Sequence, residues 1–112
     1  MGTALPYLIG MNTIVESRMF TRKVSQIWND VELEAFKEFI AQKPLAGSVI
    51  PGTGGVRKVR WGRTGSGKRN GVRVIYFIRS PHETWLLTLY AKNEIEDIPA
   101  HELKKVREKI DG

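Results

Sequence analysis

The chain has 112 residues, enough for one compact domain but too few to bury two independent hydrophobic cores. Hydrophobic residues make up 41% of the sequence and charged residues 27%, a composition that excludes an intrinsically disordered chain. The formal net charge of +6 favours a polyanionic partner.

The absence of cysteine excludes several chemistries at once. Disulfides, thiolate nucleophiles, iron–sulfur clusters and cysteine-ligated zinc all need this residue. No apolar run approaches the roughly 20 residues that span a bilayer, and the first residues lack the basic segment of an export signal. We therefore expect a cytoplasmic protein without a membrane partner.

The amino-terminal residues 1–10 show no periodicity and precede a second methionine, Met11. We interpret them as a leader or tag of unknown role and expect a single domain over residues 11–112. Its first element is a strand at residues 12–16, where Ile14 and Val15 are β-branched. Ser17 can cap the helix that follows.

Two stretches with apolar residues at helical spacing come next. The first contains Phe20, Val24, Ile27 and Trp28, and the second contains Val31, Ala35, Phe36, Phe39 and Ile40. Between them, Asn29 and Glu32 have the spacing of a capping box. The pattern predicts two helices in an αα hairpin that ends before Pro44.

A segment rich in glycine and proline, residues 44–55, separates these helices from a region of alternating apolar residues. Strands are expected at residues 56–61, 72–79 and 84–92, with a turn at residues 80–83 between the last two. Because the connections are short, the three strands should form an antiparallel meander.

A last helix is expected after Pro99, which suits the first turn because its missing N–H would be unpaired there. Leu103, Val106 and Ile110 form its narrow apolar stripe. We interpret its basic residues as a solvated face, and these are Lys104, Lys105, Arg107 and Lys109. The fold class is therefore α+β, in the order β-α-α-β-β-β-α.

The charges are distributed unevenly along the chain. Residues 47–82 contain eight basic and no acidic side chains, whereas residues 1–46 contain five of each. A surface that is charged only for solubility normally mixes both signs. The acid-free stretch therefore favours binding of a polyanion such as a nucleic acid.

Alternation of side chains along the strands should gather these cations on one face of the sheet. The apolar face carries Val59, Trp61, Val74, Tyr76, Ile78, Trp85, Leu87 and Leu89, and we expect helices to cover this face alone. The opposite face, which we call the cationic face, also includes Leu86 and Thr88 and should stay open. Its functional residues should meet in one concave patch, and these are Lys58, Arg60, Arg73, Tyr90 and Lys92.

Other kinds of site have little support in the sequence. Residues 62–69 nearly match the phosphate-binding pattern G-x-x-x-x-G-K-[ST], but Arg69 replaces the hydroxyl that would bind magnesium, and a strand follows instead of a helix. His82 and His101 lack an acidic cluster, so neither a metal site nor a cofactor is expected. Lysine, arginine and tyrosine side chains remain, and they suit a metal-free ribonuclease.

Three segments carry a resemblance to a known family: residues 54–61 (GGVRKVRW), 67–76 (GKRNGVRVIY) and 89–94 (LYAKNE). Together they resemble the RelE/HigB toxin superfamily over about residues 11–110, and most of all its HigB-2 type branch. The resemblance implies a RelE-like microbial ribonuclease fold. It also implies a toxin of a type II toxin-antitoxin module that cuts mRNA on the ribosome and is neutralised by a cognate antitoxin of the helix-turn-helix type.

The resemblance also implies roles for individual residues. Lys58 or Arg60 would assist attack of the ribose 2′-OH on the adjacent phosphorus, and Arg73 would bind the phosphate. Since a guanidinium is a poor base, Lys58 is the better proton acceptor. Lys92 would protonate the leaving 5′ oxygen. RelE toxins also use a tyrosine near the C-terminus, and Tyr90 either replaces it or that element is missing here.

Four further cations of the acid-free stretch are expected to bind the RNA backbone, and these are Arg57, Arg63, Lys68 and Arg69. Two other functions stay open. The same charges suit a non-catalytic nucleic-acid-binding module, because affinity for phosphate needs no proton transfer. A degenerate toxin homologue that serves only as a partner of the antitoxin is the third hypothesis.

Overall fold

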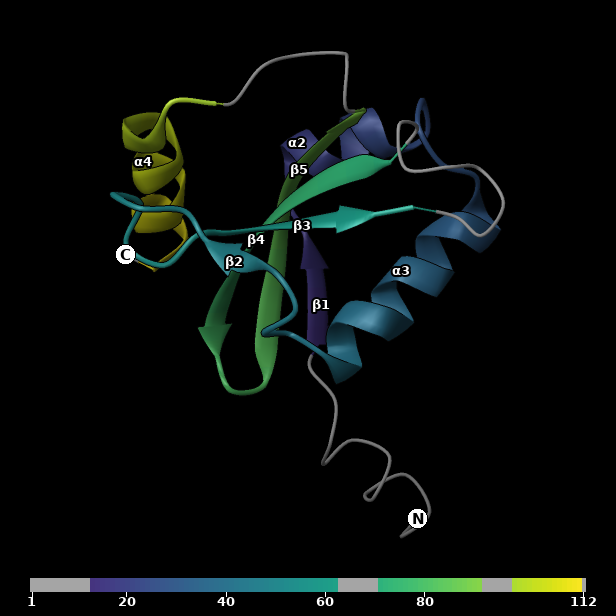
Figure 1. Ribbon diagram of the computed structural model, residues 1–112, viewed down its shortest axis with the longest axis horizontal. Helices are drawn as coiled ribbons and strands as arrows, with labels where there is room; N and C mark the ends of the chain where they lie inside the picture. Colours follow the sequence, from purple (N-terminus) through teal and green to yellow (C-terminus); the bar gives the residue numbers. More distant parts are fainter. Residues whose placement is uncertain (1–12, 63–70, 92–97, 112) are drawn as a thin grey trace, which may run out of the picture.

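The computed structural model describes residues 13–62, 71–91 and 98–111, and within them a mixed sheet of five strands carries helices on both faces (Figure 1). The elements in chain order are β1 (Thr13–Glu16), α2 (Arg18–Val24), α3 (Asp30–Gln42), β2 (Ser48–Val49), β3 (Arg57–Trp61), β4 (Val72–Ser80), β5 (Glu83–Ala91) and α4 (Ala100–Asp111). The α+β class is confirmed, and the predicted order gains one strand, β2.

The two amino-terminal helices begin at the predicted caps. The Ser17 hydroxyl accepts a hydrogen bond from the Phe20 amide at 3.1 Å at the start of α2. At the start of α3, Asn29 Oδ1 accepts from the Glu32 amide at 2.8 Å, and Glu32 Oε1 accepts from the Asn29 amide at 2.9 Å. Helix α3 ends at Gln42, so the expected hairpin before Pro44 is confirmed.

The strands lie in the order β1-β5-β4-β3-β2. The meander of β3, β4 and β5 is antiparallel as predicted, and its bounds agree with the prediction to within one residue wherever the structure describes them. Strand β1 pairs with β5 in parallel at one edge, and β2 pairs with β3 at the other. The sequence did not reveal β2 because two residues are too few to show a period.

The first hydrophobic cluster fills the space between the sheet and the helices α2 and α3. Its buried residues are Phe20, Val24, Trp28, Phe36, Ile40, Val59, Val72, Val74, Tyr76, Leu86 and Leu89. The half-buried Trp61 joins this cluster: its ring centroid lies 5.6 Å from that of Phe36 and 4.6 Å from that of Phe39. Most residues of the two predicted stripes therefore face the sheet, including Ile27 and Trp28, which follow the end of α2. The exceptions are Val31, which is 75% exposed, and Ala35, which is also exposed, so the prediction was wrong for these two residues of α3.

The prediction that helices cover one face only was wrong. Helix α4 lies on the opposite face, apart from α2 and α3 (Figure 1), and forms a second cluster there. The buried residues of this cluster are Val56, Ile75, Phe77, Leu87, Tyr90 and Leu103. The physical reason is that Ile75 and Phe77 share the cationic face and need cover from water.

A bulge in β5 explains a second wrong prediction. The pairing shifts between Ile75↔Thr88 and Tyr76↔Leu86, which leaves Leu87 as an extra residue on β5. The extra residue turns each β5 side chain on the amino-terminal side of the bulge to the face opposite the predicted one. Leu86 therefore packs against α2 and α3 instead of lying on the cationic face. Leu87 and Trp85 instead pack in the cluster with α4.

Helix α4 begins at Ala100, and the Pro99 carbonyl accepts from the amides of Glu102 and Leu103 in its first turn. Leu103 is buried, while Val106 and Ile110 pack against the cluster in part, as the stripe predicted. Arg107 does not belong to a solvated face: it is half-buried, with its Cζ 5.2 Å from the centroid of the Phe77 ring. That prediction was wrong because Arg107 lies four residues after the buried Leu103, on the face that α4 turns toward the sheet.

Candidate nucleic-acid interface

Three of the predicted site residues on the cationic face form a row across the strands. In the register of the sheet, Arg60 on β3 lies opposite Arg73 on β4, and Arg73 lies opposite Tyr90 on β5. Side chains of residues that are directly opposite share a face and lie about 5 Å apart at Cβ. Lys58 is two residues from Arg60, opposite Ile75, on the same face. The structure therefore brings four of the predicted residues together.

The pair formed by Arg60 and Arg73 is unfavourable for the protein alone. Like charges that lie directly opposite each other in a sheet destabilise it. In addition, Arg73 Nη1 is buried and makes no hydrogen bond within the residues that the structure describes. A buried donor without an acceptor costs about 1–3 kcal/mol, and more for a charged group. An anion bound at this pair would supply both the missing acceptor and the opposite charge.

Lys58 and Tyr90 line a small cavity beside the row. Its volume is about 80 Å³, and its lining residues are Ile50, Lys58, Ile75, Tyr90, Ile98 and Leu103. Tyr90 is only 3% exposed and packs in the α4 cluster, so its ring lines a cavity instead of offering an open platform for a base. Lys58 is half-buried. The sequence did not reveal the part played by Ile98 and Leu103, because α4 was not expected on this face.

Arg57 lies on the other face of the sheet, where it has a structural contact. Its Nη1 donates a hydrogen bond to the Gly47 carbonyl at 2.6 Å. The Tyr76 hydroxyl accepts from the Gly47 amide at 2.9 Å and donates to the Pro44 carbonyl at 2.6 Å. Burial raises the pKa of Tyr76, and the Gly47 hydrogen bond and the nearby Arg57 charge oppose this rise only in part. The structure therefore does not bring Arg57 to the row.

Lys92, Arg63, Lys68 and Arg69 lie outside the described residues. Residues 63–70 connect β3 to β4 next to the pair Trp61↔Val72, and Lys92 follows directly after Ala91, the partner of Val72. The described residues nearest to these segments in the sheet, Trp61, Val72 and Ala91, lie one residue beyond the row of Arg60, Arg73 and Tyr90.

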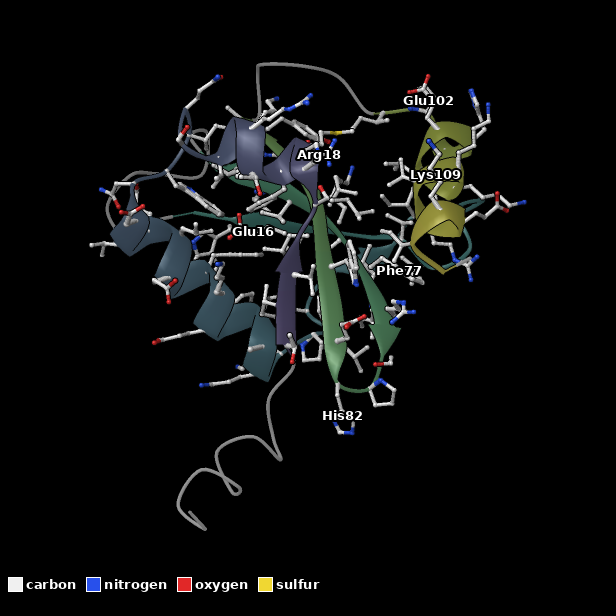
Figure 2. The ribbon with its side chains drawn as sticks, turned by 180° about the vertical axis from the view of Figure 1, so that it is seen from behind. Glu16, Arg18, Phe77, His82, Glu102 and Lys109 are labelled. Carbon is white, nitrogen blue, oxygen red and sulfur yellow. The ribbon has the colours of Figure 1, made fainter. Side chains whose placement is uncertain are left out.

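The histidines lie at the surface. His82 and His101 are both exposed (His82 is labelled in Figure 2). Among the described residues there is no group of three or more histidine, aspartate or glutamate side chains arranged to hold a metal ion. In the same part of the chain, no helix has the length and apolar character needed to cross a membrane.

The fold and the site together define a small α+β domain whose sheet presents paired guanidinium groups beside a lysine and a tyrosine. The family model of the RelE toxin of the RelE/RelB toxin-antitoxin system matches residues 14–110. Because this match covers most of the chain, the protein belongs to the RelE toxin family. This match confirms the family part of the resemblance, and RelE toxins pair with RelB antitoxins.

Proposed function

We propose that this protein is an endoribonuclease toxin of the HigB-2 type that cuts mRNA on the ribosome without a metal ion. The observation that carries the proposal is the row of Arg60, Arg73 and Tyr90 beside Lys58, with the buried Arg73 Nη1 lacking a partner among the described residues. A site of this kind can hold a phosphodiester and stabilise charge on its oxygens in the transition state. Membership of the RelE family supports the choice of RNA.

The proposed reaction transfers phosphorus from one oxygen to another within the RNA. The ribose 2′ oxygen loses its proton and forms a bond to the adjacent phosphorus, while the bond from phosphorus to the 5′ oxygen breaks. The products are a 2′,3′-cyclic phosphate and, after proton uptake, a 5′-hydroxyl. No bond to the protein and no oxidant is involved.

The roles of the residues follow from their chemistry and position. The lone pair of the unprotonated Lys58 amine accepts the 2′ proton, from the half-buried place of this side chain in the cavity. The guanidinium groups of Arg60 and Arg73 stay protonated and bind the non-bridging phosphate oxygens. Lys92 protonates the leaving 5′ oxygen, and Tyr90 is the other candidate for this step. Residues 63–70 carry further cations toward the RNA backbone.

Induced expression of the wild type and of the double variant Lys58→Ala/Arg73→Ala tests the proposal. The wild type should arrest growth and leave cleaved transcripts with 5′-hydroxyl ends, whereas the double variant should do neither. Arg79→Ala is the matched control: Arg79 lies on the same strand but is exposed, pairs with Glu83 at 2.8 Å and is remote from the row. It should behave as the wild type.

Cleavage of mRNA on translating ribosomes in magnesium buffer tests the chemistry directly, with purified protein that has been treated with EDTA and then freed of the chelator. We expect the treated protein to cleave as the untreated protein does. Salt-sensitive RNA binding without cleavage would instead favour the non-catalytic module. A stable complex with the antitoxin, with no growth arrest by the free protein, would favour the degenerate homologue.

A further inference from the structure

The loop between β2 and β3 has a defined backbone conformation beside helix α4. Gly52, Gly54 and Gly55 have positive φ angles of 80°, 77° and 113°. The buried Thr53 hydroxyl donates to the Ile50 carbonyl at 2.6 Å and accepts from the Val56 amide at 3.0 Å. These bonds close the loop on itself, so its glycines present a fixed backbone surface.

Helix α4 packs directly on this surface. A β-carbon on Gly54 would lie 3.3 Å from Arg107 Nε and 3.4 Å from Arg107 Cδ. A β-carbon on Gly52 would lie 3.7 Å from the Ala100 Cβ. Residues 100 and 107 are two helical turns apart on one face, so the loop contacts α4 along much of its length.

The Arg107 side chain is held from a second side by an aromatic ring. Its guanidinium carbon lies 5.2 Å from the centroid of Phe77, a cation–π contact. Phe77 lies beside α4 in Figure 2, and a β-carbon on Gly55 would lie 3.6 Å from its ring. The guanidinium is thus confined between strand β4 and the glycine loop.

The apolar contacts of α4 alone define its position weakly. Within the described side chains of this helix, Leu103 is the single one that is buried, whereas Val106 and Ile110 are half-buried. A narrow stripe with one buried anchor lets a helix slide or rotate at low cost. Arg107, one turn further on, supplies a second fixed point.

The position of α4 matters because the helix and the residues before it complete the cavity of the site. Ile98 and Leu103 line this cavity together with Lys58 and Tyr90. The strand residues are set by the register of the sheet, whereas Ile98 and Leu103 are set by the docking of α4. A displaced helix would leave Lys58 in place but open the cavity around it.

We propose that Arg107 is a positioning residue of the candidate site. Its contact with Phe77 and Gly54 fixes α4 so that Ile98 and Leu103 close the cavity around Lys58 and Tyr90. The part of this inference that concerns turnover rests on the proposed function, while the part that concerns the cavity does not.

Chemical labelling of lysine tests the cavity independently of activity. We compare acetylation rates of Lys58 and Lys37 by mass spectrometry in the wild type, Arg107→Gln and Arg107→Lys. Lys37 on α3 is also partly exposed, at 26%, but pairs with Glu16 far from α4, so it reports any general loosening. Arg107→Gln should raise the ratio of the Lys58 rate to the Lys37 rate roughly two- to tenfold, the size expected from one cation–π contact.

Three further variants make the result specific. Arg107→Lys keeps the cation and should stay near the wild-type ratio, and the exposed Lys104→Gln on the same helix should leave it unchanged. Phe77→Leu removes the ring but keeps an apolar side chain, so it should raise the ratio as Arg107→Gln does. It also serves as the test if Arg107→Gln does not fold. An equal ratio in all variants would overturn the proposal.

Kinetics then separate this proposal from the proposed function. In ribosome-dependent cleavage, Arg107→Gln should raise KM several-fold and change kcat less, because the residues on the strands keep their register. A changed labelling ratio with unchanged KM and kcat would overturn the positioning role in the reaction. A wild type that cleaves no RNA would refute the proposed function, and the labelling ratio would still decide whether Arg107 closes the cavity.

Discussion

Arg57 and Lys58 are neighbours in the acid-free stretch, yet the alternation of side chains along β3 places them on opposite faces of the sheet. Arg57 and Tyr76 lie opposite each other on the α2 and α3 side, where their polar groups hold the backbone at Pro44 and Gly47. Lys58, the next residue, lies on the cationic face. One position along the chain therefore changes a structural cation into a candidate functional one.

Tyr76→Phe should destabilise the fold by about 1–3 kcal/mol, because the buried Gly47 amide and the Pro44 carbonyl lose their partner. Urea denaturation at pH 7 measures this loss. The contribution should be pH dependent: since burial raises the pKa of Tyr76 in the folded state, the unfolded phenol ionises first as the pH rises above its ordinary value of 10.0.

The stability that Tyr76 contributes is therefore fully present at neutral pH and is lost as the pH rises through the folded-state pKa. The difference in unfolding free energy between wild type and Tyr76→Phe should shrink above pH 10. Both proteins share every other titrating group, so the comparison isolates this phenol. A difference that stays constant from pH 8 to pH 11 would contradict the assignment.

At the scale of the elements, the capping box is the clearest case of local sequence deciding local structure. Asn29→Ala should cost about 1 kcal/mol of stability because the Glu32 amide loses its acceptor at the start of α3. Thermal unfolding followed by circular dichroism measures it. Asn29→Gly is the matched control and should cost only a few tenths of a kcal/mol, because glycine also suits a cap. Equal losses in the two variants would argue against the capping role.

The elements that the sequence did not predict depend on contacts between distant segments. The bulge at Leu87 arises where β5 pairs with β4, and no residue pattern within β5 announces it. Strand β2 exists because Ser48 and Val49 meet β3. Helix α4 carried a correctly predicted apolar stripe, yet the stripe does not say which face of the sheet it covers. That choice follows from the second set of apolar residues on the cationic face.

At the scale of the whole molecule, the charge imbalance should make RNA binding strongly dependent on salt. Binding of single-stranded RNA weakens with log[salt] by a slope of about −0.7 for each phosphate neutralised. Arg73→Ala should therefore make the slope less steep by about 0.7. A 2′-O-methyl RNA, which lacks the nucleophilic hydroxyl, allows the measurement without cleavage.

Arg22→Ala is the control for this experiment. Arg22 is exposed on α2, on the other side of the sheet from the row, and its removal lowers the net charge by the same amount. It should leave the slope unchanged within error. An equal change in both variants would mean that net charge, and not the row of residues, binds the RNA.

The sequence by itself determined the α+β class, the helix caps, the meander and the face shared by Lys58, Arg60, Arg73 and Tyr90, because these depend on short-range periodicity and on hairpin pairing. Only the tertiary structure decided that Arg57 turns away from the row, that Tyr90 is buried, and that Arg107 anchors α4 beside Lys58. The physical reason is that the burial of a side chain on a sheet depends on which element packs against that face of the sheet. The cationic face is covered by α4, which follows the sheet in the chain. Contacts with the loop that contains Gly52 and Gly54, about fifty residues earlier, set the position of this helix.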